Sequence, residues 1–445
     1  EMSSESPKSS LRLFKGLVFV SSQTEGGMTK TLYLCYFGLR QPLVQTQVLP
    51  YLREIVKDGI KVHLLTFEQS PKENWTTEDI ELERKKLASE NIEWHFLTYH
   101  KTPSVPATVF DVLNGARFAR NLAKKEQLDI FHGRVHIPTM MAWLANKTLG
   151  KNRPKLLFDI RGFFPEEYVD AGIWRKDSKV FRAVKKVEKW LLRDADGFVT
   201  LTEKGREILF TESKETGLDL QNRPVEVIPC CVDLDKFKLA NAESRKEMRR
   251  KLRIEDRFVV AYVGSFGGFY MTEETAEFYG TLKERKKNAF ALILTQSDPQ
   301  IIKEPLEKYG LRQEDYFIRK VSPSEIPVYL SAADAAVSLI KPCYSKLASS
   351  PTKNAEYLAC GLPVVVNDGI GDTTELTLRD KTGTVLKDFS RESCEVAIDE
   401  LDALLLQKSE LAERCKKSAR EHFDLDCVGG DRYRRIYKRM LEGNR

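Results

Sequence analysis

The sequence predicts an α/β protein made of two doubly wound domains that face each other. Short apolar runs alternate with helical stretches from Thr31 to Pro229, and a second alternation of the same kind runs from Arg257 to Asn367. This alternation is typical of a parallel sheet with helices on both faces. The length of 445 residues, with 42% hydrophobic and 31% charged residues, fits a globular chain of more than one domain.

In the first alternation, the apolar runs are short and do not alternate with polar residues, which predicts parallel strands buried on both faces. The predicted strands are 31–37, 61–67, 130–132, 155–159, 197–202 and 225–229, and the predicted helices are 48–57, 107–124 and 179–193. The last of these helices is basic and amphipathic. Its apolar face suits packing, while its lysines could contact an anionic membrane surface.

Residues 240–255 are strongly charged and carry no apolar stripe, which predicts a linker at 236–256. Beyond it, the predicted strands are 257–263, 290–295, 316–320, 335–339 and 364–367, with a helix at 273–286. The predicted division is an N-terminal extension at 1–30, a first domain at 31–235, the linker, a second domain at 257–425, and a C-terminal helix at 426–445 that can cross back to the first domain.

Composition excludes several classes of function. The net charge of +6 is too small and too dispersed to indicate nucleic-acid binding, although it is compatible with anionic ligands. The eight cysteines form no Cys-x-x-Cys pair, so the sequence predicts no metal site. No stretch approaches the roughly 20 apolar residues of a spanning helix, and the first residues lack a clean secretory pattern. The expected location is the cytoplasm, with contact at the inner face of a membrane compatible with this charge.

One segment carries the most specific pattern: SSPTKNAEYLACGLPVVVNDGIGD, from Ser349 to Asp372. It predicts a helix at 353–360, ended by Gly361, and then a buried strand. Lys353 and Glu356 share a face near the helix N-terminus, where free amides and the helix dipole attract anions. Lys353 adds a point charge for phosphate, and Glu356 can accept hydrogen bonds from ribose hydroxyls. The segment therefore predicts a sugar-nucleotide pocket; an ion pair on the helix surface is the alternative.

Residues that follow predicted strands are further candidates, because ligands of open parallel sheets bind beyond the carboxyl ends of the strands. Gly264 and Ser265 also suit an ordinary strand-to-helix turn. The arginines could pair with carboxylates inside the first domain, and His132 could be a hydrogen-bonded structural histidine. The candidates are Gly38, Gln45, His132, Arg134 and Arg161 in the first domain, and Gly264, Ser265, Lys320 and Thr352 in the second.

Several motifs, taken in order, carry a family resemblance. SPTKNAEYLACGLPVV matches a Glu-x-x-x-x-Gly-x-Pro-Val-Val signature, with Glu356, Gly361 and Pro363 in register. GLRQPLVQTQVLPYLREI, VIPCCVDLDKF, AYVGS and DKTGTVL are similar to other elements of the same family. Together they resemble the retaining glycosyltransferases of family four, whose GT-B fold has two Rossmann-like domains facing across a cleft. The resemblance covers residues 31–425.

The resemblance implies transfer of a sugar from a nucleotide-diphosphate sugar to a glycan or lipid-linked acceptor, as in the synthesis of surface polysaccharides or glycoconjugates. It implies no cofactor besides this substrate. The roles that follow are donor binding by Gly264, Ser265, Lys320, Thr352, Lys353 and Glu356, catalysis by Lys353 and Arg161, and an acceptor side formed by Gly38, Gln45, His132, Arg134 and Arg161.

The chain departs from the family pattern at two places. Ala348 stands where the family often has the first glutamate of Glu-x7-Glu, and the usual arginine and Lys-Gly after the AYVG strand are missing. Two alternatives therefore stay open: a sugar-nucleotide epimerase of the same fold, and a non-catalytic sugar-nucleotide-binding partner of an assembly complex. Asp233-Leu-Asp235 resembles a metal-binding Asp-x-Asp pair, but Asp233 suits a helix cap, so we predict no metal ion.

Overall fold

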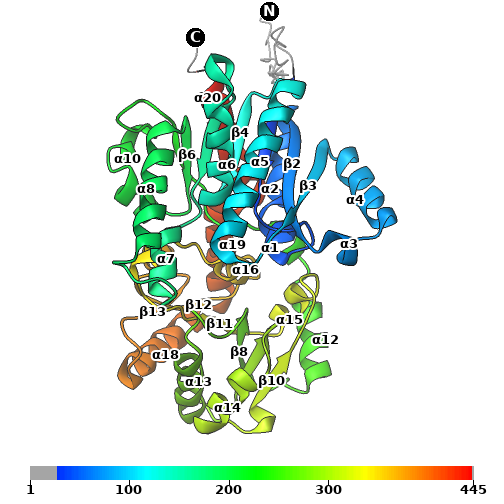
Figure 1. The fold of residues 1–445 in the computed structure, drawn as a ribbon. Coiled ribbons are helices and arrows are strands. Elements are labelled where there is room, and N and C mark those ends of the chain that lie inside the picture. The colour runs from blue at the N-terminus through cyan, green and yellow to red at the C-terminus, as the bar shows by residue number, and fades with distance from the viewer. Residues whose placement is uncertain (1–27, 443–445) are drawn as a thin grey trace, which may run out of the picture.

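The computed structural model describes residues 28–442 and contains two α/β domains, one above the other in Figure 1. Each domain is built on one sheet, of seven strands in the first domain and six in the second. Helices cover both faces of each sheet (Figure 1). This architecture confirms the predicted pair of doubly wound domains. Of the predicted extension at 1–30, all but residues 28–30 lie outside the described residues.

All the ladders of the first sheet are parallel, in the order β3-β2-β1-β4-β5-β6-β7. Its strands are β1 (Lys30–Leu34), β2 (Lys61–Gln69), β3 (Ile92–Tyr99), β4 (Ile130–Arg134), β5 (Lys155–Asp159), β6 (Gly197–Thr200) and β7 (Val225–Val227). The sequence analysis missed β3. This strand lies at the edge of the sheet and is partly exposed, so it lacks the continuous apolar run that marks a central strand.

The second sheet is also parallel, in the order β10-β9-β8-β11-β12-β13. The strand expected after Gly361 is β12, and all four of its residues are buried, as its unbroken run of valines predicts. The strands are β8 (Phe258–Val263), β9 (Ala289–Leu294), β10 (Tyr316–Arg319), β11 (Ala335–Ser338), β12 (Val364–Asn367) and β13 (Gly383–Leu386).

The helices of the first domain are α1 (Pro42–Gln47), α2 (Leu49–Ile55), α3 (Pro71–Asn74), α4 (Thr77–Ser89), α5 (Ser104–Glu126), α6 (His136–Lys147), α7 (Phe164–Asp170), α8 (Lys179–Asp194), α9 (Glu203–Leu209) and α10 (Ser213–Thr216). Those that follow are α11 (Leu234–Phe237), α12 (Ala242–Leu252), α13 (Thr272–Arg285), α14 (Gln300–Lys308), α15 (Ile326–Ser331), the 3-10 helix η4 (Tyr344–Ala348), α16 (Thr352–Ala359), α17 (Thr373–Asp380), α18 (Arg391–Leu405), α19 (Lys408–Phe423) and α20 (Asp431–Glu442). Within residues 28–442, no helix has both the length and the apolar character needed to cross a membrane.

The segment predicted as a linker is largely helical and is held on the second domain. Arg245 and Arg249 of α12 bind the buried carboxylate of Asp334, with N–O distances of 2.6 and 3.3 Å. The same carboxylate accepts a hydrogen bond from the Val259 amide of β8 at 3.0 Å. These contacts attach α12 to the second domain through buried ion pairs, together with Met248, which is buried in the core of this domain.

The chain crosses between the domains twice, and the two crossings run side by side. The Val232 amide donates to the Phe423 carbonyl at 2.8 Å, and the Leu425 amide donates to the Val232 carbonyl at 3.1 Å. After the second crossing, α20 packs on the first domain. There Tyr437 contacts His132 at 2.9 Å, and Arg435 binds Glu226 at 2.8 Å.

In each sheet the strand order reverses direction beside a central strand, between β1 and β4 in the first and between β8 and β11 in the second. The loops that leave the two strands at such a point diverge to opposite faces of the sheet and open a crevice between them. In the second domain these are the loop after β8, which begins at Gly264, and the loop after β11, which leads to η4 and α16.

Candidate functional site

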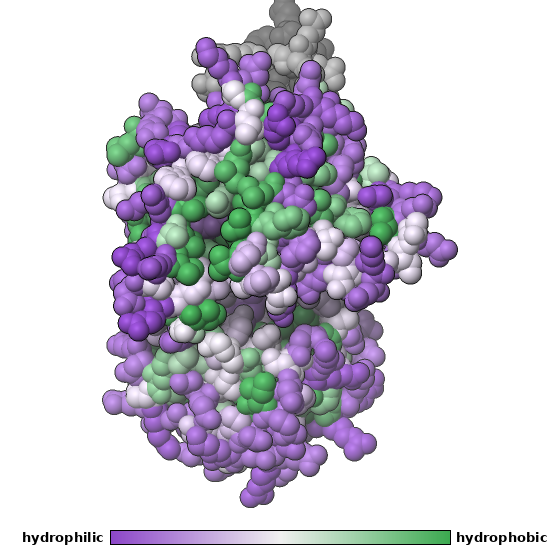
Figure 2. Space-filling view, in the orientation of Figure 1, coloured by the Kyte–Doolittle hydropathy of each residue, from purple (hydrophilic) through white to green (hydrophobic). Residues whose placement is uncertain are grey.

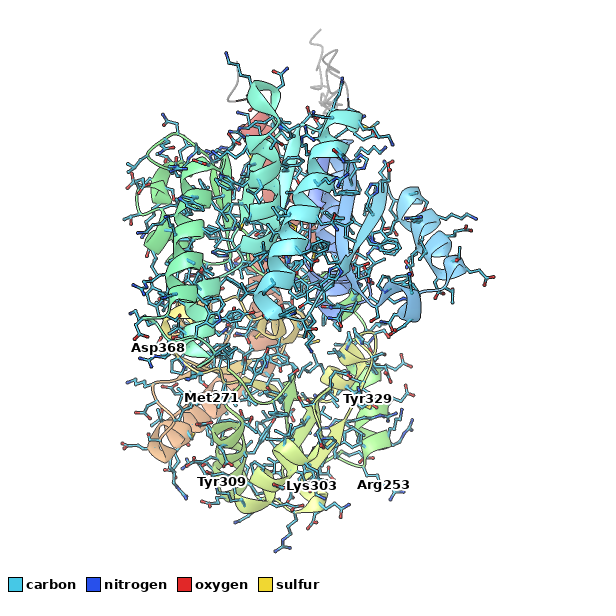
Figure 3. The ribbon with its side chains drawn as sticks, viewed as in Figure 1. Arg253, Met271, Lys303, Tyr309, Tyr329 and Asp368 are labelled. Atoms are coloured by element: carbon cyan, nitrogen blue, oxygen red, sulfur yellow. The ribbon has the colours of Figure 1, made fainter. Side chains whose placement is uncertain are left out.

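A cavity of about 680 Å³ opens between the two domains at the carboxyl ends of the second sheet. Figure 2 shows the surface hollowed where the domains meet. Most of the lining comes from the loops after β8, β9, β10 and β11 and from the start of α16, and the first domain adds Glu167 and Leu201. Met271, which follows the lining residue Tyr270, is labelled in Figure 3 on the side of the second domain that faces the first.

Lys353, in the first turn of α16, lies at the centre of this lining. A Cβ atom added at Gly264 would lie 2.9 Å from its Nζ atom, and Gly264 has a φ of +140°, so a side chain there would crowd the ammonium. The rings of Tyr262 and Tyr270 lie 4.4 and 4.3 Å from Nζ, in the geometry of cation–π contacts. The ammonium is thus held over a bare stretch of backbone.

Although it lines the cavity, the Lys353 side chain is largely buried. Its relative exposure is 8%, and the rings of Tyr262, on strand β8, and Tyr270, in the loop after β8, lie against its ammonium. Burial lowers the pKa of Lys353 to about 7, and the nearby Glu356 offsets this only in part. A lysine with such a pKa gains its charge most readily when an anion binds beside it.

Glu356 lies one turn further along α16 and also lines the cavity. Burial raises the pKa of this carboxyl to about 7, against the opposing effect of Lys353. Among the described residues, no side chain or amide donates a hydrogen bond to it, and Lys353 is not within ion-pair distance. The alternative of a helix-surface ion pair therefore does not hold, because both residues line the cavity. Glu356 keeps its acceptor capacity for a ligand, whereas Lys353 Nζ donates to the Tyr262 hydroxyl at 3.4 Å and keeps its other donors.

The remaining predicted donor residues divide into two groups. Gly264, Ser265 and Thr352 line the cavity, and Pro351 at the N-cap of α16 offers no side-chain cap, so the first amides of the helix are free. Lys320 does not line the cavity and is exposed. Gln296 and Val321, from neighbouring loops, line that end instead. A strand-end position alone could not distinguish Lys320 from these neighbours.

Three predicted residues of the first domain form a buried network instead of an acceptor surface. His132 lies between Tyr437 at 2.9 Å and Asp159 at 3.3 Å, and burial lowers its pKa. Arg134 donates to the Gln47 carbonyl at 3.3 Å, and Arg161 donates to the Gln47 side chain at 3.1 Å. None of the three lines the cavity.

The geometry therefore gives no support to a catalytic role for Arg161. It agrees with the alternative that His132 is a hydrogen-bonded structural histidine. Helix α20 covers these strand ends: Tyr433 donates to Asp159 at 2.8 Å and accepts from Arg161 at 3.4 Å. A network that joins β4, β5 and α20 anchors the C-terminal helix on the first domain.

The two remaining acceptor-side candidates differ in position. Gly38 lies in a tight turn, where an added Cβ atom would be 2.7 Å from the Glu68 carboxylate. The absence of a side chain at Gly38 therefore allows this close packing. Gln45 lines a smaller cavity of about 370 Å³ that also includes Thr352 and Glu356. Gln45 is thus the predicted first-domain residue that faces the space between the domains.

Several lining residues were missed by the sequence analysis, above all Glu167 and Lys346. Glu167 follows the predicted strand 155–159 within FDIRGFFPEE, and this strand-end position was the signal that could have drawn attention to it. No local sequence pattern marked Lys346 as a site residue, because its ion-pair partner, Glu167, lies in the other domain.

Asp233 and Asp235 have local partners. Asp233 accepts from the Asp235 amide at 3.1 Å as the N-cap of α11, and Asp235 binds Lys238 at 2.5 Å. In the described part of the chain, one trio has metal-ligand chemistry, His63, Glu93 and His95, with ligand atoms within 4.8 Å of one another. Lys61 binds Glu93 at 2.9 Å, and the trio lies on β2 and β3, outside the cavity lining.

Activity is expected to survive exhaustive chelation with EDTA, and Asp235→Asn should keep wild-type turnover. The physical reason is that the cavity already presents an ammonium and free helix amides to an anion, while Asp233 is used as a cap. Turnover measured before and after dialysis against EDTA, with magnesium or manganese added back, checks this. Loss on chelation with recovery on metal addition would show that the Asp233–Asp235 pair had been misread.

A two-domain fold with a ligand cavity between facing Rossmann-like sheets defines the GT-B class. The profile of the family "Glycosyltransferase Family 4" matches residues 44–236, and that of "Glycosyl transferases group 1" matches residues 244–422. The chain therefore belongs to the family-four glycosyltransferases with the GT-B fold, as the motif resemblance indicated.

Two curated relatives are similar over part of the chain. The alpha-monoglucosyldiacylglycerol synthase of Streptococcus pneumoniae is 25% identical over 62% of this chain and 60% of that protein. The 2-deoxystreptamine glucosyltransferase of Streptomyces kanamyceticus is 28% identical over 42% of this chain and 46% of that protein. The chain thus spans less than two thirds of either relative.

Solved structures share the fold across most of the chain. A glycosyltransferase from Rickettsia africae has a TM-score of 0.66 at 16% identity and covers 94% of this chain and 100% of its own. Anabaena HepE in complex with UDP has a TM-score of 0.62 at 16% identity and covers 92% and 100%.

Proposed function

We propose that the protein is a retaining glycosyltransferase that uses a nucleotide-diphosphate sugar. The observation that carries the proposal is the position of Lys353, whose ammonium lies beside the bare backbone of Gly264 at the uncapped N-terminus of α16. A diphosphate is the ligand that combines with an ammonium, free helix amides and a glycine loop in one place. Stabilising the departing diphosphate would be the main electrostatic task.

The rest of the cavity accommodates the nucleoside. Glu356 has free acceptor capacity one turn beyond Lys353, which suits the two hydroxyls of a ribose. Gln296, Val321 and Pro323 line the part of the cavity next to β9 and β10, which suits a flat base with polar edges.

We propose that the acceptor hydroxyl attacks the anomeric carbon from the face that the diphosphate leaves. The bond from this carbon to the phosphate oxygen breaks, the bond to the acceptor oxygen forms, and the acceptor proton passes to the leaving phosphate oxygen. The two carboxylates of the lining support this route, because Glu167 is bound by Lys346 and Glu356 lies at the ribose position. Neither is placed as a free nucleophile at the sugar.

A lipid-linked acceptor is the class that we propose first. Val105, Val109, Phe110 and Leu113 are all more than half exposed on the first half of α5. Figure 2 shows apolar side chains gathered on this face of the first domain, over α5 and α6. An exposed apolar patch of this kind marks an interaction surface, and the lysines of α8 could add attraction to anionic lipid. One relative is named as a synthase of a glucosyldiacylglycerol.

The proposal is tested by two measurements on the same protein. A thermal-shift screen against UDP, GDP and ADP sugars identifies the donor, because a specific ligand raises Tm with the logarithm of its concentration. Release of the free nucleotide diphosphate is then followed with and without diacylglycerol and glycolipid acceptors in vesicles. Acceptor-dependent release with retained anomeric configuration supports the proposal. Conversion of the donor without acceptor would indicate an epimerase, and binding without any conversion would indicate a non-catalytic partner.

Glu356→Ala should weaken the binding of the free nucleotide diphosphate by about 1.5–3 kcal/mol, the range for loss of a hydrogen bond to a charged group. Calorimetry at pH 8, where the carboxyl is ionised, measures this. Glu314→Ala is a control, since Glu314 is exposed and does not line the cavity. Equal nucleotide affinity in the Glu356 variant and the wild type would assign Glu356 to a structural role.

A further inference from the structure

Two charged residues from different domains meet inside the cavity. Lys346 Nζ of η4 lies 2.5 Å from Glu167 Oε1 of α7, and it also lies 3.7 Å from the centre of the Phe269 ring. The Lys346 side chain is 10% exposed, while that of Glu167 is 44% exposed. All three residues line the cavity, so this pair is part of its wall and spans the junction of the domains.

The position of the pair follows from the strand order β10-β9-β8-β11-β12-β13. The residues proposed for the base follow β9 and β10, on one side of the central strand β8. Lys353 and Gly264 lie at the centre, and Lys346 follows β11, on the other side. A nucleotide-diphosphate sugar that places its base beside β9 and β10 and its diphosphate at Lys353 therefore extends its sugar toward Glu167 and Lys346.

The residue that the family pattern places in this loop is absent here for a structural reason. Ala348 is 3% exposed, and its Cβ would lie 3.2 Å from a Cβ atom added at Gly205 of α9. Position 348 therefore faces the packed contact with the first domain, and a glutamate side chain has no room there. The carboxylate at this end of the cavity is instead Glu167, which comes from the other domain.

We propose that Glu167 and Lys346 bind the hydroxyl groups of the donor's sugar, and that this sugar is an uncharged hexose. The inference rests on the proposed function, since it requires the diphosphate to bind at Lys353. Both groups keep capacity for a ligand, because a carboxylate offers about four lone-pair sites and an ammonium three donors, of which one contact is used here. Their charges cancel, so the wall offers paired donors and acceptors without a net charge for a uronate.

This arrangement makes sugar binding depend on the domains being closed. Glu167 belongs to the first domain and Lys346 to the second, so separation of the domains removes the carboxylate from the sugar end of the cavity. The diphosphate and ribose positions belong to the second domain alone. A free nucleotide diphosphate can therefore bind without closure, whereas the hexose is held only after it.

The competing explanation is that the Glu167–Lys346 pair only holds the two domains together. Helix α7 supplies a matched control for this explanation. Asp170 on the same helix accepts a hydrogen bond from the Ser345 amide of η4 at 2.9 Å, so it also joins the two domains. Unlike Glu167, Asp170 does not line the cavity. Asp170→Asn therefore weakens the same domain contact without removing a group from the sugar end.

The test is the ratio of two affinities measured by calorimetry: that for a nucleoside diphosphate and that for its glucose conjugate, taken for UDP, GDP and ADP. For the nucleotide that binds the wild type, Glu167→Gln should weaken the glucose conjugate about tenfold or more, with the free diphosphate unchanged within about twofold. Lys346→Met should show the same pattern. Asp170→Asn should leave the ratio at its wild-type value, and thermal unfolding verifies that each variant is folded.

The possible failures are distinguishable. If no nucleotide binds the wild type, the proposed function itself fails. If the diphosphate binds but Glu167→Gln leaves the ratio unchanged, or Asp170→Asn changes it equally, Glu167 only joins the two domains. The inference about the sugar then fails, while the proposed function stands. Tighter wild-type binding of the glucuronate conjugate than of the glucose conjugate would overturn the assignment of an uncharged hexose.

Discussion

Replacing Lys353 by alanine should lower the turnover number about a hundredfold, comparable to the loss of one preorganised donor at a developing oxyanion. The ammonium lies beside Gly264 at the uncapped end of α16. The other lysine of the cavity lining, Lys346, is bound by Glu167, so we expect no other cation to take its place. Steady-state kinetics with saturating donor measures the effect. Lys320→Ala is the matched control, because Lys320 is an exposed lysine of the same domain that does not line the cavity.

The fold of the Lys353→Ala variant should be retained, since burial already disfavours the charged lysine and lowers its pKa to about 7. Thermal unfolding checks this. Wild-type turnover in a folded alanine variant would remove Lys353 from the mechanism. Equal losses in the Lys353 and Lys320 variants would point to a general effect of surface charge.

The same lysine should couple nucleotide binding to protonation. At pH 8 the free protein holds Lys353 mostly neutral, because its pKa is about 7, and a bound diphosphate raises that pKa again. Binding should therefore take up as much as about one proton, and affinity should fall by up to about tenfold per unit as the pH rises above 7. Glu356 is already ionised there. Calorimetry in two buffers of different ionisation enthalpy measures the uptake, which Lys353→Ala should abolish.

The largest loss of stability should come from Asp334→Ala, at about 3–5 kcal/mol in the free energy of unfolding of the second domain. The buried Asp334 carboxylate binds Arg245, Arg249 and Lys408 and accepts from the Val259 amide. Its removal leaves the buried guanidinium of Arg249 without its carboxylate, and α12 loses its ion pairs to the second domain. A lower urea midpoint measures the loss.

Asp177→Ala is the control for this substitution. Asp177 pairs with Arg175 at 2.9 Å, but both side chains are largely exposed, so removing this pair should cost less than about 1 kcal/mol. A similar urea midpoint for the Asp334 and Asp177 variants would contradict the claim that the charged residues of α12 form a buried anchor.

Local patterns in the sequence were enough for the fold and for the centre of the site. The apolar runs identify most of the strands because central strands of a parallel sheet are buried on both faces, whatever their partners are. The segment with Lys353, Glu356 and Gly361 likewise defines a helix, a turn and a strand within a few residues of one another. The edge strand β3 escaped because its partial exposure weakens this local signal.

The tertiary structure decided the features that join distant residues. The Glu167–Lys346 pair spans 179 positions and the Arg161–Tyr433 contact spans 272, so no local pattern relates their partners. The return of α20 turned His132 and Arg161 from candidate acceptor groups into a buried anchor. Lys353 of α16 is enclosed by Tyr262 and Tyr270, which belong to β8 and the loop after it, 91 and 83 positions earlier in the chain. The physical reason is that secondary structure follows from the periodicity of neighbouring residues, whereas burial, pKa and pairing depend on which remote surfaces the chain crossings bring together.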